Sequence, residues 1–462
     1  MPGRARCRDS PMPPPDSRRA LRLGAALALA CAAAAPAADP PAAEWPRLVV
    51  RSLADTGEGT LRAMLDAAER REGPDLITFD PELIGEPRTI ELARALPPVT
   101  SDVTLDGTVP DRLWRAVGVT ISGGDRLRPF EVAPGGRLTL RALTIAHGAA
   151  RDGGGVLNRG ELRAEGVTFR DNAAECDGGA IAHLDGRLAV VNATFARNRA
   201  GARGGAVAAL ADDAAFVHGT FAANGAARGG GLYAAGSLRL ANSILADNAP
   251  GSDCVAEPGA AMPPARNLIG SSEGCGESFV AGDANLGTLG YFNGPTPVVP
   301  LNGGSPAINL GDPADALDLD GLPLYWDQRG NGDPRRVAGF PDLGAFEHQA
   351  FPKLVVDTAA DTALRACTSA VRGDCPLRGA LELALADPRH GTIRFDPEVF
   401  AAPATLPLAA PLPRLTRALT LDAGATAGVT LAPGGNFPAL AADPGAEPVL
   451  LGVTLAAPPG AP

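Results

Sequence analysis

An internal repeat of about 25 residues is the feature that most constrains how this chain of 462 residues can fold. Short triplets, several with a central Thr, recur between residues 143 and 245, and their third residues lie 24, 26, 26 and 24 positions apart. These third residues are Ile145, Phe169, Phe195, Phe221 and Leu245, and the residues three positions later are Gly148, Asn172, Asn198, Asn224 and Asn248. Constant spacing of this kind indicates a solenoid, in which each unit buries its apolar residues against its neighbours.

Two further series keep the same spacing. One is rich in glycine, at Gly154–Val156, Gly179–Ile181, Gly205–Val207 and Gly230–Leu232, and the other is apolar, at Leu138–Leu140, Leu162–Ala164, Leu188–Val190 and Leu238–Leu240. Three short strands per unit, separated by Asn and Gly corners, predict one coil of an all-β parallel β-helix. A helical repeat is excluded because glycine interrupts every unit, at a cost of about 1 kcal/mol for each Gly in a helix.

The corner residues receive structural roles in this interpretation. The residues concerned are Asn172, Asn198, Asn224 and Asn248 in one corner and Gly179, Gly205 and Gly230 in another. Asn can adopt a left-handed backbone conformation, and its amide can bond to the Asn of the coils above and below, so we predict an Asn ladder. Glycine permits the other bend.

Particular motifs resemble a known family. The Gly-Gly-Ala-[Ile/Val] motif at Gly178–Ile181 and the Phe-x-x-Asn motif at Phe195–Asn198 resemble the repeats of polymorphic outer-membrane proteins and other bacterial right-handed β-helix proteins. Five later blocks are similar, in order, to the choice-of-anchor Q domain that closes many such helices: Asn267–Gly270, Asn293–Thr296, Gly304–Ile308, Asp327–Gly330 and Asp342–Glu347. The resemblance implies a right-handed β-helix followed by a closure.

The two ends of the chain repeat each other. Leu48–Val50 and Leu354–Val356 begin two similar runs of motifs, and both starts resemble a CSLREA-type N-terminal segment, of which the second keeps Cys367 and Cys375. Each start predicts a short amphipathic helix, with Leu61, Met64, Leu65 and Ala68 or Leu377, Ala380, Leu381 and Ala384 on one face, that caps its solenoid. We therefore expect a signal peptide (1–38), a cap with first coils (39–137), repeats (138–252), a Q-like closure (253–350) and a second, truncated copy (351–462).

The N-terminus predicts export, which bears on the cysteines. Arg18 and Arg19 precede an apolar run from Leu21 to Ala35, followed by small residues suited to cleavage. General and twin-arginine export both stay open, and a lipoprotein at Cys31 is disfavoured because Ala28 stands where Leu is usual. Export permits disulfides, and we predict the two pairs close in sequence, Cys254 with Cys275 and Cys367 with Cys375, leaving Cys176 as a small, half-buried spare.

Charge limits the partners. The net charge is −11, and without residues 1–38 the chain holds 35 basic and 50 acidic residues, or −15, which disfavours nucleic acid. No stretch outside the signal is long and apolar enough for a transmembrane helix, and we expect a monomer.

The candidate catalytic residues are Asp212, Asp213 and His218, the closest approach to a polygalacturonase-like site. The required Arg-x-Lys is missing, since the chain has a single lysine, Lys353, and we interpret the group as an irregular coil with solvated carboxylates. We likewise interpret His147 and His183 as surface residues of turns.

An acidic loop offers a second candidate site. Asp312, Asp315, Asp318 and Asp320 resemble a calcium loop, but Ala316 occupies the first EF-hand position, so calcium is a weak alternative to having no cofactor.

These observations favour an exported or cell-surface β-helix protein that is not an enzyme and that adheres to glycans or to protein surfaces. A carbohydrate-active enzyme with a divergent site and a structural cell-envelope protein are the alternatives, because fold alone does not give function.

Overall fold

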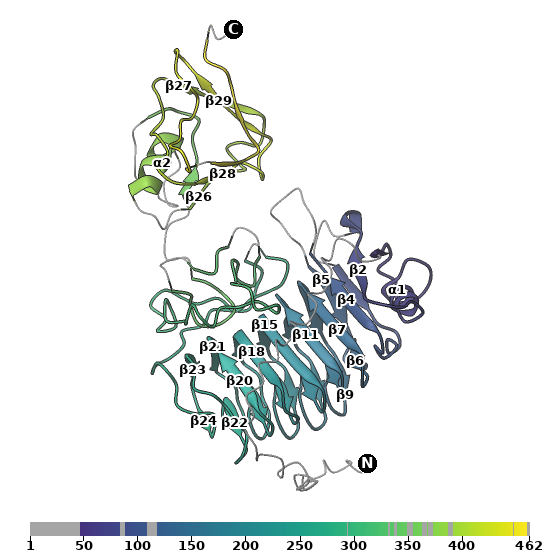
Figure 1. Ribbon diagram of the computed structural model, residues 1–462. Helices are drawn as coiled ribbons and strands as arrows, with labels where there is room; N and C mark the ends of the chain where they lie inside the picture. Colours follow the sequence, from purple (N-terminus) through teal and green to yellow (C-terminus); the bar gives the residue numbers. More distant parts are fainter. Residues whose placement is uncertain are drawn as a thin grey trace, which may run out of the picture.

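The computed structural model describes residues 47–459, apart from 84–87, 109–117, 293, 331–332, 337–339, 349–353, 363–366, 368–372, 387–390 and 447. The predicted signal peptide and Cys31 lie outside the described residues. The chain folds as a parallel β-solenoid with two short α-helices, as the repeat predicts (Figure 1). A second, smaller solenoid follows the first.

Three sheets run along the first solenoid. The largest contains β1 (Arg47–Val50), β2 (Asp75–Phe79), β3 (Arg88–Glu91), β4 (Asp102–Asp106), β5 (Val119–Ser122), β7 (Arg137–Arg141), β8 (Leu143–Ala146), β11 (Glu161–Glu165), β12 (Thr168–Arg170), β15 (Arg187–Ala196), β18 (Ala214–Ala222), β20 (Leu238–Ala241), β21 (Ser243–Ala246) and β23 (Asn267–Ile269). The second contains β6 (Phe130–Val132), β10 (Val156–Asn158), β14 (Ile181–His183), β17 (Val207–Ala209), β19 (Leu232–Ala234), β22 (Cys254–Ala256) and β24 (Ser272–Glu273). The third is short, with β9 (Ala149–Ala150), β13 (Ala173–Ala174) and β16 (Arg199–Ala200).

The register of these strands explains the sequence repeat. Equivalent residues of successive coils face each other, as in Phe169↔Phe195 and Phe195↔Phe221, so the interior is built of columns of like side chains. The rings of Phe169, Phe195 and Phe221 are stacked with centroids 5.0 and 4.5 Å apart. Leu, Val and Ile fill the other columns, and this one continuous core contains most of the buried apolar residues of the first solenoid.

The Asn ladder forms at one corner. Asn172 Nδ2 donates to Asn198 Oδ1 (2.9 Å), Asn198 Nδ2 to Asn224 Oδ1 (2.9 Å) and Asn224 Nδ2 to Asn248 Oδ1 (2.8 Å). These Asn residues do not use the left-handed conformation that is open to Asn. The residue before each takes that conformation: Asp171, Arg197, Ala223 and Asp247, with φ between 55 and 61°. The bend is therefore made one residue earlier, which leaves the amide in the column.

The glycine corner also uses two successive positions. Gly178, Gly204 and Gly229 have φ of 63 to 66°. At the glycine that follows each of them, the neighbouring coil leaves no room for a Cβ atom. A Cβ on Gly179 would lie 2.0 Å from the carbonyl oxygen of Gly205, and one on Gly205 would lie 2.1 Å from that of Gly230. The backbones of successive coils thus approach too closely for any side chain.

Residues 285–348, here called the closure segment, lie along the flank of the first solenoid. Thr120, Thr144, Thr168, Thr194 and Thr220 form an outward-facing column on β5, β8, β12, β15 and β18, yet all five are buried. The closure segment bonds directly to this column, with Thr168 Oγ1 donating to the carbonyl of Pro297 (2.6 Å). The Q-like blocks after residue 285 therefore cover a side of the solenoid, where the sequence suggested that they close it, while the first block, Asn267–Gly270, supplies β23 of the solenoid itself.

Both expected capping helices are present. The first, α1 (Leu61–Ala68), has Thr60 as its N-cap, buries Leu61, Leu65 and Ala68, and packs on β1 and β2. The second, α2 (Leu377–Ala386), buries Leu377, Ala380, Leu381 and Ala384 and packs against β25 (Leu354–Val356) and β26 (Thr392–Phe395).

The second solenoid, residues 354–459, has its own core. One sheet has the order β25-β26-β28-β30, with β28 at Thr420–Asp422 and β30 at Val449–Leu451. The other has the order β27 (Ala404–Leu408), β29 (Val429–Pro433) and β31 (Val453–Leu455). A 3-10 turn, η2 (Pro81–Leu83), completes the elements of the described chain.

Candidate functional site

Gln328, from the Asp327–Gly330 block, joins the closure segment to the threonine column. Its amide nitrogen donates to Thr168 Oγ1 (2.8 Å) and Thr296 Oγ1 (3.0 Å), while its amide oxygen accepts from Thr194 Oγ1 (2.6 Å). All four side chains are buried. Gln328 therefore fastens the closure segment to two neighbouring coils, and this sequence block has a structural role.

Buried ion pairs complete the attachment. Arg335 Nη2 lies 2.9 Å from Glu347 Oε2, with both side chains inaccessible to solvent, and Arg335 Nη1 donates to the Asn192 side chain of the solenoid (3.2 Å). Arg329 pairs with Asp327 (2.6 Å) and Asp333 (2.9 Å). Burial raises the pKa of Glu347 to about 8, although the Arg335 guanidinium lowers it. Of these contacts, the Arg335–Asn192 bond reaches the solenoid, while the pairs made by Arg329 and Arg335 join residues within the closure segment and hold its shape.

His218 lies under the same segment, away from the two aspartates with which the sequence grouped it. Its Nδ1 is 3.3 Å from the Gly344 carbonyl and its Nε2 is 3.2 Å from Asn242 Nδ2. Burial and the nearby Arg335 lower its pKa well below the usual value. A neutral imidazole with its proton on Nδ1 satisfies both contacts, so His218 acts as a buried bridge.

Asp212 and Asp213 lie at the preceding corner of the coil. The Asp212 carboxylate accepts from the Ser237 N–H (2.7 Å), and the exposed Asp213 lies 3.7 Å from Arg187. The structure thus places His218 beneath the closure segment and both carboxylates at the solvent, and it does not bring the three together.

The acidic loop is held by arginines of the solenoid. Asp315 pairs with Arg239 (2.7 Å) and Asp320 with Arg163 (2.5 Å), while Asp318 accepts the N–H groups of Asp320 and Leu322. Asp312 lies 3.7 Å from Arg266. Within the described ranges, no group of three or more His, Cys, Asp or Glu could hold a metal ion. Asp312, Asp315 and Asp320 therefore dock the loop on the solenoid, and Asp318 holds the turn of the loop itself.

The two remaining histidines differ. His147 is partly exposed and lies 3.2 Å from Asp125, as expected of a turn residue. The prediction that His183 is a surface residue is wrong: it is fully buried in the register of Val132 and Asn158. Asn158 Nδ2 is 3.0 Å from His183 Nδ1, and His183 Nε2 is 3.0 Å from the Asp212 carbonyl. Adjacent polar residues in one column satisfy each other, which makes the interior position tolerable.

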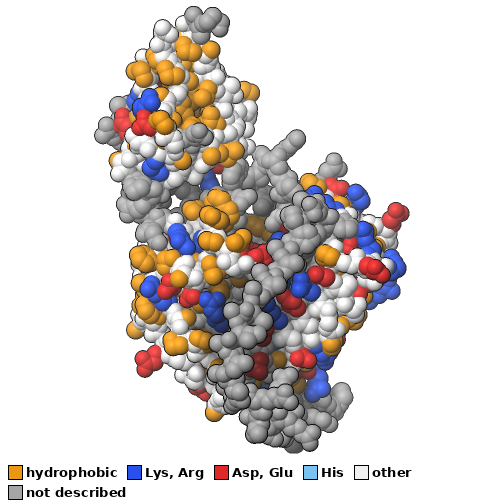
Figure 2. Space-filling model, in the orientation of Figure 1, with side chains coloured by type: hydrophobic (Ala, Val, Ile, Leu, Met, Phe, Trp, Pro, Cys, Tyr) orange, Lys and Arg blue, Asp and Glu red, His pale blue; other side chains and the backbone are white. Residues whose placement is uncertain are grey.

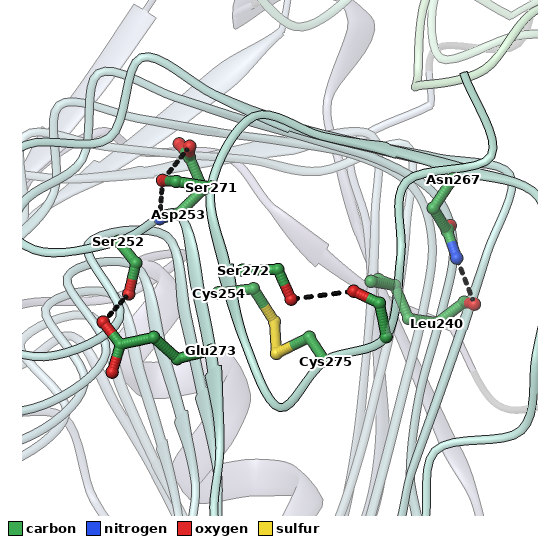
Figure 3. Close-up of a disulfide and its surroundings, with 10 residues drawn as sticks. Leu240, Ser252, Asp253, Cys254, Asn267, Ser271, Ser272, Glu273 and Cys275 are labelled. Atoms are coloured by element: carbon green, nitrogen blue, oxygen red, sulfur yellow. Dashed lines mark hydrogen bonds between the residues drawn. A yellow bond between two sulfur atoms is a disulfide. The ribbon is translucent and has the colours of Figure 1, made fainter. Parts of the chain in front are cut away.

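Figure 3 shows how the last coils of the first solenoid end. The predicted Cys254–Cys275 disulfide is present and buried, at the end of a core column that includes Leu232. Asp253 ends the Asn ladder, because its Oδ1 accepts both the backbone and side-chain N–H of Asn248 (2.9 and 2.7 Å). Its Oδ2 accepts from Ser271 Oγ (2.7 Å). A disulfide and side-chain hydrogen bonds therefore close the end of this solenoid.

The other cysteines of the described chain are also disulfide-bonded. Cys367 and Cys375 form the second predicted disulfide. The expectation that Cys176 is a half-buried spare is wrong, because it is buried and it too is disulfide-bonded. Disulfides indicate an oxidising environment outside the cytoplasm.

Exposed apolar side chains on the closure segment are the feature that sequence reasoning missed. Leu322 is 61%, Tyr325 74% and Trp326 42% exposed, and they are followed by the buried Asp327 and Gln328. Figure 2 shows apolar side chains at the surface of the closure segment. The sequence held a signal, since residues 291–326 contain three of the chain's six Trp and Tyr residues.

Comparisons with protein-family models, curated proteins and solved structures found no match to this chain. Within the part of the chain that the structure describes, no helix is long and apolar enough to cross a membrane.

Proposed function

We propose that this is an exported surface-recognition protein that binds neutral glycans through the patch formed by Leu322, Tyr325 and Trp326, here called the aromatic patch. In this proposal the protein is related to the polymorphic outer-membrane-protein repeats, CSLREA segments and Q domains that its motifs resemble. The exposure of these side chains, in a chain with only 4% aromatic residues, is the observation that carries the proposal.

The patch is held rigidly from beneath. Asn192 Nδ2 of the solenoid donates to the Trp326 carbonyl (2.9 Å), and Arg335 N donates to the Tyr325 carbonyl (2.9 Å). Asp327 and Gln328, next in the chain, belong to the buried network. A backbone fixed in advance loses little conformational freedom on binding, which favours affinity.

Chemistry favours a neutral saccharide. Tyr and Trp rings pack on the C–H faces of sugar rings while their polar atoms hydrogen-bond, and contiguous exposed apolar surface usually marks a binding site. The acidic charge of the body, −15 without residues 1–38, opposes sulfated or uronic-acid polymers.

A glycan array with neutral and anionic saccharides tests the proposal. We expect binding to neutral glycans that Tyr325→Ala and Trp326→Ala together weaken by at least about tenfold, consistent with losing two interface aromatics. Phe279→Ala is the matched control, because Phe279 is an exposed aromatic outside the closure segment.

Equal losses in the control and the double variant would contradict the aromatic patch. Release of unsaturated products from pectin or alginate by the purified protein would instead support the enzyme alternative, and absence of any glycan binding would leave the structural role.

A further inference from the structure

The fold holds two Asn-Gly sequences of this chain in very different ways. Asn-Gly occurs at 224–225, 293–294, 302–303 and 331–332, and the structure describes both residues at 224–225 and at 302–303. In such a sequence the backbone nitrogen of the glycine can attack the side-chain amide carbon of the asparagine, because glycine has no Cβ to hinder the approach. The attack requires a free backbone N–H and room for the chain to bend.

Asn302–Gly303 meets both requirements. The two residues are exposed, and a Cβ built on Gly303 would meet no atom within 4 Å. Among the hydrogen bonds of the described residues, none is donated by the backbone N–H of Gly303. The side-chain amide of Asn302 donates to Asn285 Oδ1 at 3.3 Å, beyond the usual length of such a bond. The attacking nitrogen and the amide carbon are therefore both free to move together.

Asn224–Gly225 meets neither requirement. The N–H of Gly225 donates to the Asn198 carbonyl (2.9 Å), and a Cβ on Gly225 would lie 2.6 Å from the carbonyl oxygen of Ala249. The Asn224 side chain is fully buried in the Asn ladder, where its Nδ2 donates to the Phe195 carbonyl (2.9 Å) and to Asn248 Oδ1 (2.8 Å). The same dipeptide is thus locked in one place and loose in the other.

Asn302 lies at the base of an antiparallel ribbon, residues 285–302, that begins the closure segment. The ribbon contains Pro297, whose carbonyl accepts from Thr168 of the solenoid. A carboxylate at position 302 could not donate to Asn285 Oδ1, and an isoaspartate there would add one methylene group to the main chain. A change at Asn302 therefore acts on the base of a ribbon that holds the closure segment to the solenoid.

We propose that Asn302 is a site of spontaneous deamidation, whereas the fold protects Asn224. The Gly303 nitrogen forms a bond to Asn302 Cγ, the bond from Cγ to Nδ2 breaks, and the side-chain nitrogen leaves as ammonia with the proton of the Gly303 N–H. The product is a cyclic succinimide. Solvent water then opens this ring at either carbonyl, which gives aspartate or isoaspartate at position 302. The reaction is independent of glycan binding.

The full chain, kept in mildly alkaline buffer and sampled over time, tests the proposal. Tandem mass spectrometry of digested samples locates each conversion, which separates Asn302 from Asn293 and Asn331, and methylation by an isoaspartyl methyltransferase detects isoaspartate. We expect Asn302 to convert at least about a hundredfold faster than Asn224, because reaction at Asn224 must wait for a local opening of the ladder.

Two controls separate the effect of the fold from that of the dipeptide. In urea both asparagines should convert at similar rates, because unfolding removes the hydrogen bonds of the ladder. Gly303→Ala should slow conversion at Asn302 on the order of tenfold, since a Cβ restricts the approach of the nitrogen, while open space leaves the fold unchanged. An Asn302 that stays an amide in the folded chain, or that converts there no faster than Asn224, would overturn the proposal, and so would a Gly303→Ala variant that converts as fast as the wild type.

Discussion

Replacing Asn198 by Asp tests the directional character of the Asn ladder. The two side chains have the same shape, so the substitution changes hydrogens and charge only. Asn198 Nδ2 donates to the Phe169 carbonyl and to Asn224 Oδ1, both at 2.9 Å, while Asn198 Oδ1 accepts from the backbone and side chain of Asn172 (3.1 and 2.9 Å). An aspartate keeps the two accepted bonds and loses the two donated ones.

The cost follows from these contacts. Each buried bond lost with its partner left unsatisfied costs about 1–3 kcal/mol, and the buried carboxylate would also face two oxygens without a cation. We expect Asn198→Asp to lower the free energy of unfolding by at least about 3 kcal/mol.

The end of the ladder provides the matched control. Asp253 donates nothing from its side chain, and in Asp253→Asn the Oδ1 atom can still accept both bonds from Asn248 while the new amide faces Ser271 Oγ. Charge assistance is lost, and the Ser271 hydroxyl loses Oδ2 as its acceptor while the new amide can donate to Ser271 Oγ, so the expected cost is about 1–2 kcal/mol. Urea unfolding followed by far-ultraviolet circular dichroism measures both. Equal costs for the two substitutions would refute the idea that donors and acceptors run in one direction along the ladder.

Three further predictions concern packing, proton linkage and the disulfides. Gly205→Ala should destabilise by about 3 kcal/mol or more in urea unfolding, because its Cβ would lie 2.1 Å from the Gly230 oxygen, whereas Gly303→Ala, with open space, should stay within about 0.5 kcal/mol. His218 has a lowered pKa, so unfolding takes up a proton below pH ~6.5 and its contribution to stability is lost as pH falls, by about 1.4 kcal/mol per pH unit. The raised pKa of Glu347 has the opposite effect, because its contribution to stability is lost as pH rises towards about 8. The effect of His218 is therefore measured as the free energy of unfolding of the wild type minus that of His218→Gln at each pH. A difference that does not vary with pH would contradict the prediction. Replacing Cys254 and Cys275 by Ser should lower the free energy of unfolding by about 3 kcal/mol, for a separation of 21 residues. The same replacement of Cys367 and Cys375 should lower it by about 2.5 kcal/mol, for a separation of 8 residues. A larger loss for the shorter loop would exclude the entropy of the unfolded state as the main cause.

Residues repeated once per coil were predictable because parallel in-register strands place equivalent side chains over one another. Phe195 and Asn198 recur with their neighbours at constant spacing, and the interior column and the corner ladder follow directly from that spacing. His183 escaped this reasoning because a polar residue in one coil gives no periodic signal, and its burial depends on the accident that Asn158 stands beside it.

The sequence by itself determined the solenoid, the spacing of its coils, the capping helices and the two disulfides close in sequence, since all of these depend on local turn chemistry or on contacts that recur with the repeat. Only the tertiary structure decided which outward-facing surface is covered. The threonine column resembles a solvated strand face, but Gln328 and Thr296, more than a hundred residues beyond Thr168, bury it. The same long-range docking buries His218, which the sequence had grouped with Asp212 and Asp213, and it leaves Tyr325 and Trp326 exposed. Contacts between distant segments leave no period in the sequence, so the candidate binding surfaces had to come from the fold.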